Sequence, residues 1–488
     1  MSIRDANVAL LPEPTALIGG KRFEDGSAEL VPHRYAATGR HTMDVPSGGP
    51  LSVQAAVADA RSTLPQWRAI APDARRRLLL KLAELIERNA EELTDIQVVE
   101  NGTPRAMAAM YAPMVADCFQ YYAGWSDKVG GEVHPVWPTP GLDYSVLEPD
   151  GVVAIIIPWN SPLFSLGTIL APALAAGNCV VVKPPELTPF TSLRLAELVL
   201  EAGIPPGVVN VVPGGAVAGS ELVAHPGVDK IHFTGSGPTA QRILTAAAAN
   251  FTPVGLELGG KSANLVFDDA DLEDAAQLAV MAALQLSGQA CVAGTRLLVQ
   301  DSVYDDMVQL CASKITALPL GDPADESTFF GPLISGAACE RVLGFVERAK
   351  ADGRPTIVTG GARVGDSLAD GFYVAPTLIA DVPRDAEVAR EEVFGPVLSM
   401  LRFRDEADAV ALANDSPYGL AAYVQTNDVA RAHRVAANLE AGVIWVNGLG
   451  GLPPSVPFGG YKHSGVGRLG GRAGLEEFSK RKNVWLAL

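Results

Sequence analysis

The sequence is poor in cysteine and histidine, and this scarcity argues against stabilisation by disulfides or metals. The five cysteines are odd in number and far apart along the chain: Cys118, Cys179, Cys291, Cys311 and Cys339. They match neither a disulfide framework nor the ligand spacing of a zinc site. The seven histidines show no metal-ligand spacing either. We therefore expect no metal site.

Long apolar runs and excess positive charge are also absent. The most apolar stretches, residues 152–157 and 275–284, are far shorter than the ~20 residues that a membrane helix needs. The first eleven residues lack the basic and apolar regions of a secretory signal. Acidic residues outnumber basic ones by 55 to 38, a formal net charge of −17, which would repel nucleic acid and anionic lipid. We expect a cytoplasmic protein without nucleic acid or membrane partners.

What the chain does contain is typical of a large globular protein with more than one domain. Its 488 residues are 48% hydrophobic and 19% charged, enough for sizeable cores. Leucine and isoleucine recur at a helical period through residues 73–99. From residue 144, short β-branched runs (152–157, 179–182, 208–212 and 230–233) alternate with helical stretches (165–176, 192–202 and 218–224). This alternation predicts a parallel sheet covered on both faces.

Two further segments complete the organisation. Strands such as 297–299 and 443–446 belong to a second alternating region, which runs from about residue 262 to 446. Residues 130–143 are rich in Gly and Pro and have no helical period, so they form either a linker or an arm. The sequence shows no internal repeat.

Candidate binding residues follow the strands of the first region. The strands at 152–157, 179–182 and 230–233 lead into Pro158-Trp159-Asn160, Lys183-Pro184-Pro185-Glu186 and Thr234-Gly235-Ser236-Gly237. Ligands of parallel sheets bind beyond the carboxyl ends of the strands, so these polar exits indicate a single cleft, although each taken alone is equally well an ordinary loop. No Gly-x-Gly-x-x-Gly follows the first strand. The nearest substitute is Gly235-Ser236-Gly237, before a helix expected to begin near Pro238, whose N-terminus would attract an anion; the alternative is a structural turn.

Two residues have surroundings that suit catalysis. Glu257 stands among apolar and glycine residues, where burial would raise its pKa and make it a general base; the alternative is a solvated loop carboxylate. Cys291 lies among small residues in a glycine-containing segment that a ligand could approach. The other four cysteines lie in apolar or helical surroundings, as buried cysteines usually do.

Taken together, these segments resemble the aldehyde dehydrogenase superfamily over nearly the whole chain. The matching motifs occur in the family's order: IIIPWNSPL, VVKPPE, GVVNVVPG, FTGS, LELGGK, GQACVAGTR, EEVFGPV, NDSPYGLAAYV, WVNG and PFGGYKHSGVGR. Each motif is weak alone, and ten in order are specific.

The resemblance implies an α/β subunit of three parts. Residues 1–129 and 150–257 would form a parallel-sheet, Rossmann-like NAD-binding domain, and residues 258–471 an α/β catalytic domain. Residues 130–149 and 472–488 would form a small antiparallel oligomerisation arm that bridges neighbouring subunits. The expected assembly is a homodimer or homotetramer.

Residue roles follow from the same resemblance. Cys291 would be the nucleophile, Glu257 the general base, and the Asn160 side chain and Cys291 backbone N–H the oxyanion hole. Lys183 and Glu186 would bind the adenosine ribose of NAD. The pyrophosphate would lie at Ser236 and its helix, and the nicotinamide and its ribose at Glu392 and Phe394. The remaining residues assigned to the cofactor site are Ile156, Trp159, Phe233, Gly235, Leu258 and Gly259.

The chain departs from the family pattern at four positions. Pro185 stands where serine is frequent, Ala240 where glycine is frequent, Leu469 where an acidic residue is usual, and Thr103 in place of a lysine. None is a predicted nucleophile, base or oxyanion donor. Pro185 and Ala240 bear on cofactor affinity.

The implied reaction is the oxidation of an aldehyde to a carboxylic acid with NAD, through a cysteine thiohemiacetal and thioester. The resemblance places uncharged side chains at the aldehyde entrance: Ser161, Phe164, Ser165, Thr168, Ala290, Val292, Leu452 and Phe458. An apolar or aromatic, uncharged aldehyde fits them better than a carboxylated semialdehyde.

Three alternatives remain. A CoA-acylating dehydrogenase has no need of a water-activating base such as Glu257. A catalytically silent structural protein would not need Cys291, Glu257 and Asn160 together. A cysteine hydrolase would need a histidine partner, and no histidine has a motif-like setting.

Overall fold

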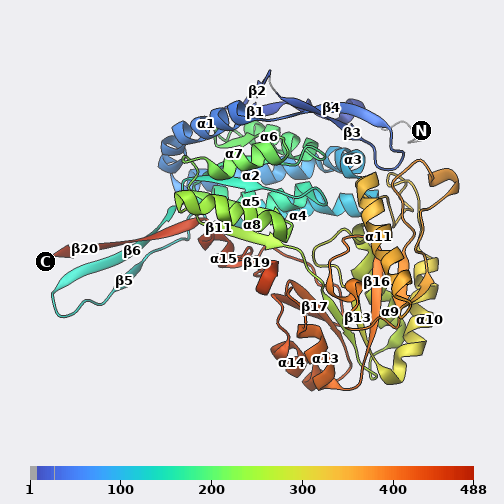
Figure 1. Ribbon diagram of the computed structural model, residues 1–488. Coiled ribbons are helices and arrows are strands. Elements are labelled where there is room, and N and C mark those ends of the chain that lie inside the picture. The colour runs from blue at the N-terminus through green and yellow to red at the C-terminus, as the bar shows by residue number, and fades with distance from the viewer. Residues whose placement is uncertain (1–7, 27, 488) are drawn as a thin grey trace.

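The chain folds into two α/β bodies and a projecting arm (Figure 1). The computed structural model describes residues 8–26 and 28–487. Most of the first eleven residues, where the sequence shows no secretory signal, therefore lie outside the described residues, as does Leu488. Parallel-strand sheets form both bodies, and a small antiparallel sheet forms the arm. This arrangement confirms the predicted fold class.

The first body is built on an eight-stranded sheet with the order β19-β11-β10-β7-β8-β9-β1-β2. Its parallel strands are β7 (Val152–Ile156), β8 (Cys179–Lys183), β9 (Val209–Val211), β10 (Lys230–Gly235) and β11 (Val254–Leu258). The four strands predicted here are found within one or two residues of their expected bounds. Antiparallel edges come from β1 (Ala16–Ile18), β2 (Lys21–Phe23) and β19 (Gly465–Val466), which the sequence pattern did not predict.

Helices cover both faces of this sheet because its strands are apolar on both sides. One face packs against α1 (Pro50–Ala69), α7 (Ala216–Ala224) and α8 (Gly237–Ala247). The other packs against α5 (Pro162–Ala176) and α6 (Phe190–Glu201), backed by α2 (Pro72–Arg88), α3 (Ala90–Asn101) and α4 (Arg105–Ala123). Gly167 permits close packing of α5 on α4, since a Cβ there would lie 2.5 Å from the Val115 side chain. A hairpin of β3 (Glu29–Arg34) and β4 (His41–Ser47) lies beside this body (Figure 1).

The second body is built on a seven-stranded sheet with the order β14-β15-β16-β13-β12-β17-β18, parallel except for β14. Its strands are β12 (Ala263–Val266), β13 (Arg296–Gln300), β14 (Thr356–Thr359), β15 (Thr377–Ala380), β16 (Val397–Phe403), β17 (Ala421–Gln425) and β18 (Val443–Val446). Separate apolar cores lie on its two faces. The helices are α9 (Leu272–Leu284), α10 (Tyr304–Thr316), α11 (Gly336–Asp352), α12 (Glu387–Arg390), α13 (Glu406–Asn414) and α14 (Val429–Asn438).

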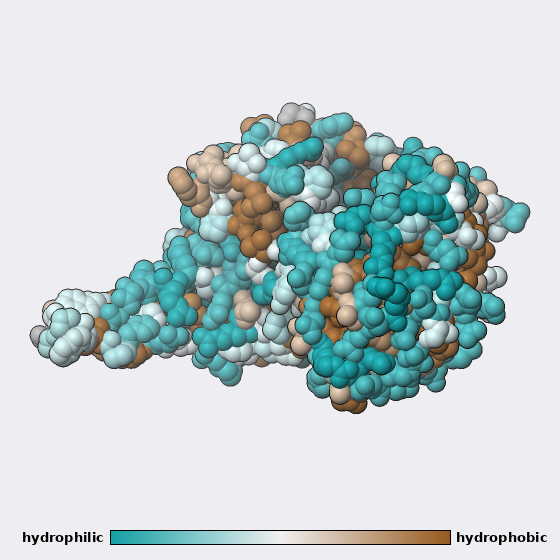
Figure 2. All heavy atoms as spheres, turned by 60° about the horizontal axis from the view of Figure 1, so that its bottom comes forward, coloured by the Kyte–Doolittle hydropathy of each residue, from teal (hydrophilic) through white to brown (hydrophobic). Residues whose placement is uncertain are grey.

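The segment that the sequence left open as linker or arm is an arm. Strands β5 (Glu132–His134), β6 (Gly141–Pro149) and β20 (Ser479–Ala487) form an antiparallel sheet, with β6 in the middle. It projects from the first body (Figure 1). Five large apolar side chains on it are exposed to solvent: Val133, Trp137, Leu142, Trp485 and Leu486. The rest of the face seen in Figure 2 is mostly hydrophilic, with scattered apolar patches.

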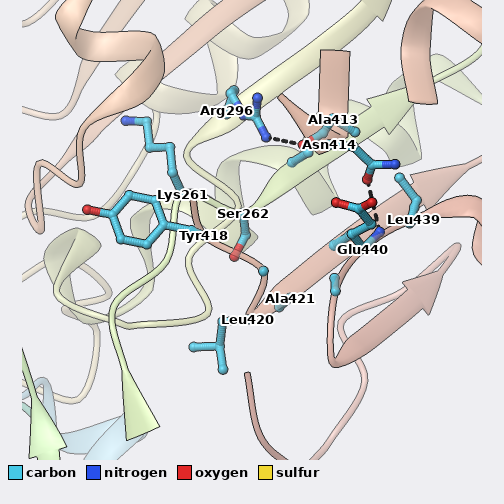
Figure 3. A pocket seen from close by; sticks show the side chains of 14 residues that line it. Lys261, Ser262, Arg296, Ala413, Asn414, Tyr418, Leu420, Ala421, Leu439 and Glu440 are labelled. Atoms are coloured by element: carbon cyan, nitrogen blue, oxygen red, sulfur yellow. Dashed lines mark hydrogen bonds between the residues drawn. The ribbon is translucent and has the colours of Figure 1, made fainter. Parts of the chain in front are cut away.

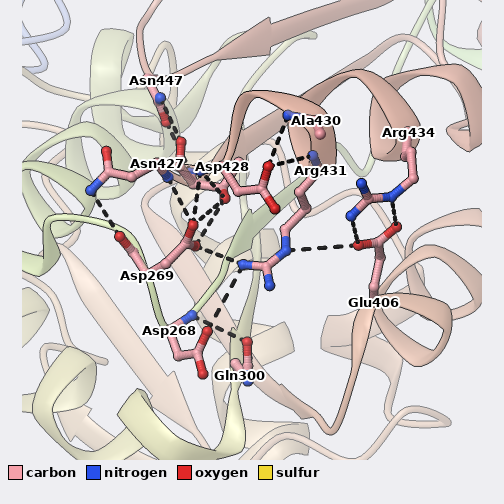
Figure 4. Close-up of polar contacts among 11 residues, drawn as sticks. Asp268, Asp269, Gln300, Glu406, Asn427, Asp428, Ala430, Arg431, Arg434 and Asn447 are labelled. Atoms are coloured by element: carbon pink, nitrogen blue, oxygen red, sulfur yellow. Dashed lines mark hydrogen bonds and ion pairs between the residues drawn. The ribbon is translucent and has the colours of Figure 1, made fainter.

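The carboxyl ends of β12 and β17 are joined by a polar network centred on Arg431 (Figure 4). The Arg431 guanidinium lies 2.8 Å from Asp269 and 3.7 Å from Glu406. Asp269 also accepts hydrogen bonds from Thr426 and from the backbone N–H of Asn427. These bonds satisfy the polar groups of two adjoining loops, so we interpret the network as structural.

Within the described residues, no helix combines the length and apolar character that crossing a bilayer requires. Within the same residues, no three His, Cys, Asp or Glu side chains are grouped as metal ligands.

Candidate active site

The candidate site lies where the two bodies meet. Glu257 is the last residue but one of β11 in the first sheet, and Cys291 lies in the loop that leads into β13 (Arg296–Gln300) of the second. The carboxyl ends of the first sheet therefore face the amino ends of the second. The Arg431 network lies at the opposite, carboxyl end of the second sheet and is not part of this site.

The three strand exits predicted to share a cleft lie side by side, because β8, β7 and β10 are neighbours in the sheet. Ile156 of β7 pairs with Lys183 of β8 on one side and with Phe233 of β10 on the other, so the three residues lie in one row across the sheet. Phe233 pairs in turn with Leu256 of β11, and the next two pairs along these strands are Thr234 with Glu257 and Gly235 with Leu258. Parallel pairing thus brings residues from four separate motifs to one edge.

Lys183 lies at the end of this line with its ammonium group buried. Its Nζ donates to the carbonyl oxygens of Gly214 and Pro184. Burial lowers the pKa of Lys183 to about 8, and the nearby Glu186 carboxylate opposes that shift. Glu186 itself lies beside Gly215, where a Cβ would be 3.3 Å from Glu186 Oε1.

The N-terminus of α8 faces open space. Ser236 caps the helix and is exposed, and its hydroxyl bonds to Thr239 rather than to a helix N–H. A Cβ on Gly237 would meet nothing within 4 Å. An eleven-residue helix whose first N–H groups have no side-chain cap is suited to hold a phosphate group.

Glu257 is buried, with 5% of its surface exposed. Its Oε2 has no hydrogen-bond partner among the described residues. Burial raises the pKa of Glu257 to about 8, while the Arg468 guanidinium lowers it and the Glu477 carboxylate raises it further. This carboxyl group is therefore not a solvated loop residue.

Cys291 follows an unusually tight turn. Leu286, Ser287 and Gly288 all have positive φ, at 51°, 57° and 74°, a conformation that costs energy at the two non-glycine residues. The Ser287 hydroxyl donates to Gly331 O (2.8 Å), and Gln289 Oε1 accepts from the N–H of Ile334 (3.0 Å). These bonds hold the strained turn in place.

Cys291 is half-buried, whereas the other four cysteines are fully buried. Burial raises the pKa of the Cys291 thiol to about 12, and the carboxylates of Glu392 and Glu257 add to this effect. Both carboxylates are therefore close enough to act on the sulfur. The thiol is protonated in this arrangement and must lose its proton as it attacks.

Asn160 is hydrogen-bonded directly to the loop that carries Cys291. Its Nδ2 donates to the carbonyl oxygen of Gln289 at 2.7 Å. The backbone around Asn160 is held in turn by Asn101, whose Nδ2 donates to the carbonyl oxygens of Trp159 (3.1 Å) and Asn160 (3.2 Å). Sequence reasoning missed Asn101, because nothing in its local sequence shows which distant loop it bonds.

The second body contributes a segment that packs against Gly259. A Cβ at Gly259 would lie 2.0 Å from Glu392 Oε2, and the N–H of Gly260 donates to Glu392 Oε1 at 3.1 Å. Burial raises the pKa of Glu392 to about 7. Phe394 has a positive φ of 50° and meets the Trp159 ring edge-on, with 5.4 Å between centroids. Four predicted cofactor residues thus lie beside one another.

The eight residues predicted for the aldehyde entrance are all partly exposed except Ser161, which is buried. Two tyrosines that sequence reasoning missed also lie near Cys291. Tyr111 of α4 stacks on Phe164 with 5.8 Å between centroids. Tyr423 of β17 donates through its hydroxyl to Val292 O at 2.9 Å. Both occupy ordinary core positions of their elements, so no local signal distinguishes them.

The four residues that depart from the family pattern either lie in the core or form local hydrogen bonds. Ala240 and Leu469 are buried in the first core. Thr103 bonds through its backbone N–H and hydroxyl to Asn101 Oδ1. Pro185 O accepts the turn bond from the N–H of Thr188. Thr103 therefore helps to orient Asn101, and none of the four disturbs Cys291 or Glu257.

A small cavity beside the second sheet contains none of the predicted site residues (Figure 3). Lys261, Ser262, Arg296, Asn414 and Glu440 are among the residues that line it. The two cations and Ser262 are buried. A second small cavity is lined by the predicted site residues Trp159 and Asn160 together with Asn101 and Gln289, among others.

Comparison with known proteins places the chain in a family. The model of the aldehyde dehydrogenase family matches residues 23–484. The chain therefore belongs to the aldehyde dehydrogenase family and is an enzyme, which confirms the resemblance seen in its motifs.

Relatives are similar along the whole chain. A betaine aldehyde dehydrogenase of Cereibacter sphaeroides is 40% identical over 481 residues, 98% of each chain. The structure of betaine aldehyde dehydrogenase from Staphylococcus aureus in complex with NAD+ has a TM-score of 0.97 at 34% identity, covering 100% of this chain and 98% of that one. PnpE from Pseudomonas sp. WBC-3 has a TM-score of 0.95 at 39% identity, covering 98% of each chain.

Proposed function

We propose that the protein oxidises an uncharged, apolar or aromatic aldehyde to the carboxylic acid with reduction of NAD. Cys291 is the nucleophile, Glu257 the general base and Asn160 an oxyanion donor. The observation that carries the proposal is the junction of the two loops: Asn160 Nδ2 bonds Gln289 O at 2.7 Å, and Glu257 acts electrostatically on Cys291. Nucleophile, base and oxyanion donor therefore share one buried site.

In the first step the S–H bond of Cys291 breaks, its proton passes to water at this half-buried residue, and the sulfur bonds to the aldehyde carbon. The carbonyl oxygen becomes an oxyanion beside the Cys291 backbone N–H and Asn160. The Asn160 amide has two N–H groups, and only one is used by Gln289 O, which leaves the other for the oxyanion. A donor of this kind contributes about 3 kcal/mol in comparable sites.

NAD supplies the hydride acceptor when it is bound. The residues present fit this cofactor: the uncapped α8 N-terminus, with open space over Gly237, suits the pyrophosphate. Lys183 and Glu186 lie at the neighbouring strand end, where they suit the adenosine ribose. Phe394 and Glu392 lie beside Gly259, where they suit the nicotinamide side. Glu186 would repel a 2′-phosphate, which favours NAD over NADP.

In the last step water hydrolyses the thioester on Cys291. Glu257 removes a proton from that water. Its pKa of about 8, raised by burial, makes the carboxylate a stronger base than an exposed glutamate. No such base is needed when CoA accepts the acyl group, so Glu257 favours hydrolysis.

The substrate proposal rests on the uncharged entrance. Phe164 and Phe458 supply the aromatic side chains of the predicted lining, Tyr111 packs against Phe164 from the core, and the lining contains no charged side chain. The test is a panel of aldehydes with NAD, followed by NADH fluorescence with and without CoA. We expect aromatic or aliphatic uncharged aldehydes to be the best substrates, and CoA to have no effect. Activity only with CoA, or only with carboxylated aldehydes, would contradict the proposal.

We also propose a homodimer or homotetramer, with residues 130–149 and 472–488 as the bridging arm. The remaining parts, 1–129 with 150–257 and 258–471, are the NAD-binding and catalytic domains. Exposed Trp137 and Trp485 on the arm support this assignment, because apolar surface of this kind usually meets a partner. Light scattering after size-exclusion chromatography should give at least twice the 51.0 kDa chain mass. Five unpaired cysteines are consistent with a reducing, cytoplasmic location.

A further inference from the structure

One buried hydroxyl group joins the two bodies beside the predicted base. The Ser464 side chain is fully buried. Its Oγ donates to the carbonyl oxygen of Gly259 at 2.7 Å and accepts the N–H of Gly419 at 2.9 Å. Gly259 directly follows β11 of the first body, and Gly419 lies just before β17 of the second. The hydroxyl therefore connects a strand end of one body with a loop of the other.

The bond to Gly259 acts on the segment that carries Glu257. Glu257 lies two residues before Gly259 and pairs with Gly465, the residue that follows Ser464. The partner strand β19 has only two residues, so backbone pairing holds this edge of the sheet over a very short length. The Ser464 bond extends the attachment past the end of β11. Residues 257–259 are thus held on one side by Ser464 and Gly465 together.

The same segment leads directly to the predicted nucleophile. A Cβ at Gly260 would lie 2.8 Å from the backbone carbonyl oxygen of Cys291. The N–H of Gly260 also donates to Glu392 Oε1 at 3.1 Å. The backbone of residues 259–260 is therefore packed between the loop that carries Cys291 and the Glu392 side chain. A shift of this backbone would change where Glu257 lies relative to the Cys291 sulfur.

The turn that carries Ser464 is itself fixed to the second body. The N–H of Tyr461 donates to Gly419 O at 2.8 Å, and the N–H of Ser464 donates to Tyr461 O at 2.9 Å. The Lys462 ammonium group donates to Asn414 O at 2.8 Å. The Ser464 hydroxyl therefore projects from an anchored turn.

We propose that Ser464 is a positioning residue for hydrolysis of the acyl-enzyme. Its hydroxyl holds Gly259, and through Gly259 it sets the position of the Glu257 carboxyl group relative to the thioester on Cys291. This inference rests on the proposed role of Glu257 as the base. Both hydrogen bonds of the Ser464 hydroxyl are to backbone groups, so Ser464 acts on the reaction only through Glu257.

The test compares Ser464→Ala with Thr377→Val. Thr377 in β15 is also fully buried. Its hydroxyl likewise donates to a backbone carbonyl, Ala375 O at 2.8 Å, and accepts a backbone N–H, that of Gly361 at 2.9 Å. Each substitution removes a hydroxyl group with the same two kinds of bond, and the bonds of Thr377 stay within its own edge of the second sheet. Melting temperatures should therefore fall to a similar extent in both variants.

The two chemical phases should respond differently in Ser464→Ala. After rapid mixing with NAD and aldehyde, this variant should form its first NADH as fast as the wild type does. The hydrolytic phase that follows should be slower by roughly tenfold, because a displaced base is less well placed to take a proton from water. Intact-mass analysis should show the acyl adduct on Cys291 persisting for correspondingly longer. Thr377→Val should match the wild type in both phases, and a Ser464→Ala enzyme that hydrolyses equally fast would overturn the proposal.

A double-mutant cycle separates positioning of the base from a general structural effect. If Ser464 acts only through Glu257, the double variant Ser464→Ala/Glu257→Gln should hydrolyse the acyl-enzyme no more slowly than Glu257→Gln alone. A further loss of roughly tenfold in the double variant would show that Ser464 acts on the reaction by another route. That result would contradict the proposal.

The single variant Glu257→Gln keeps the positioning role separate from the proposed function. If Glu257→Gln stalls at the acyl-enzyme while Ser464→Ala hydrolyses normally, only the positioning role is wrong. If Glu257→Gln itself hydrolyses normally, the base role is wrong as well. If Ser464→Ala does not fold, Ser464→Cys replaces it in the same cycle. Its thiol is a weak donor and a weak acceptor in the same place, so slowing of the same step is expected.

Discussion

The burial of Glu257 predicts that hydrolysis of the acyl-enzyme depends steeply on pH. With a pKa of about 8, about a tenth of the carboxyl is ionised at pH 7 and about nine tenths at pH 9. Only the ionised form can take a proton from water. The rate of thioester hydrolysis should therefore rise about tenfold between pH 7 and pH 9.

A pH jump isolates this step from thiol attack, which has its own pH dependence because the Cys291 thiol is also buried. The acyl-enzyme is formed at pH 6 with NAD and aldehyde and then transferred to the final pH. Its decay is followed by quenching and intact-mass analysis. Glu257→Gln, which keeps the shape but cannot take a proton, should hold the adduct for much longer at every pH.

Stability gives a second readout that needs no substrate. The folded pKa of about 8 lies above the ordinary value of 4.5, so the folded state favours the protonated form. The protonated carboxyl group therefore adds to the free energy of unfolding. This added stability is fully present below pH 4.5 and is lost as pH rises through 8, with an upper limit of about 5 kcal/mol. Glu257→Gln should therefore be the more stable protein at pH 9. A flat decay rate from pH 7 to 9, with unchanged hydrolysis and stability in Glu257→Gln, would refute this reasoning.

Three other predictions follow from the geometry. Glu186→Gln should narrow the preference for NAD over NADP, measured as the ratio of kcat/KM values; a lower KM for NADP in the wild type would contradict the ribose assignment. Asn101→Ala removes the bonds to Trp159 O and Asn160 O and should lower kcat by roughly tenfold through misplacement of the oxyanion donor, with an unchanged circular dichroism spectrum. Deleting residues 479–487 removes β20 and should reduce the mass measured by light scattering; an unchanged mass would exclude the arm as the bridge.

The sequence predicts the sheet best where its strands are continuous apolar runs. Residues 152–157 and 179–182 carry such runs between Gly, Pro and Asn, and both became central strands. The edges were missed, because β1 has three residues and β19 only two. A stretch that short carries no periodicity, and its pairing depends on distant neighbours.

The same limit applies to the site. Cys291 and Glu257 could be proposed as nucleophile and base from the sequence, because each lies in a motif that resembles the family's, and these roles stay predictions. The contacts that position Asn160 and set the pKa of Glu257 could not be predicted from the sequence. Asn101 reaches Asn160 from 59 residues away, and Glu477, far along the chain from Glu257, helps to raise the pKa of that residue. Such neighbours are fixed by tertiary packing, and so are the raised pKa values of Cys291 and Glu257.

The most direct test of the account is aldehyde oxidation by Cys291→Ala. Cys291 is half-buried beside Glu257, whereas the other four cysteines lie inside the apolar cores. NADH formation should be measured for this variant and for single replacements of the four buried cysteines, with NAD binding and melting temperature as controls. The account predicts that Cys291→Ala binds NAD and stays folded but forms no NADH, while correctly folded variants of the other four retain substantial activity. A Cys291→Ala enzyme that reduces NAD at the wild-type rate would contradict it.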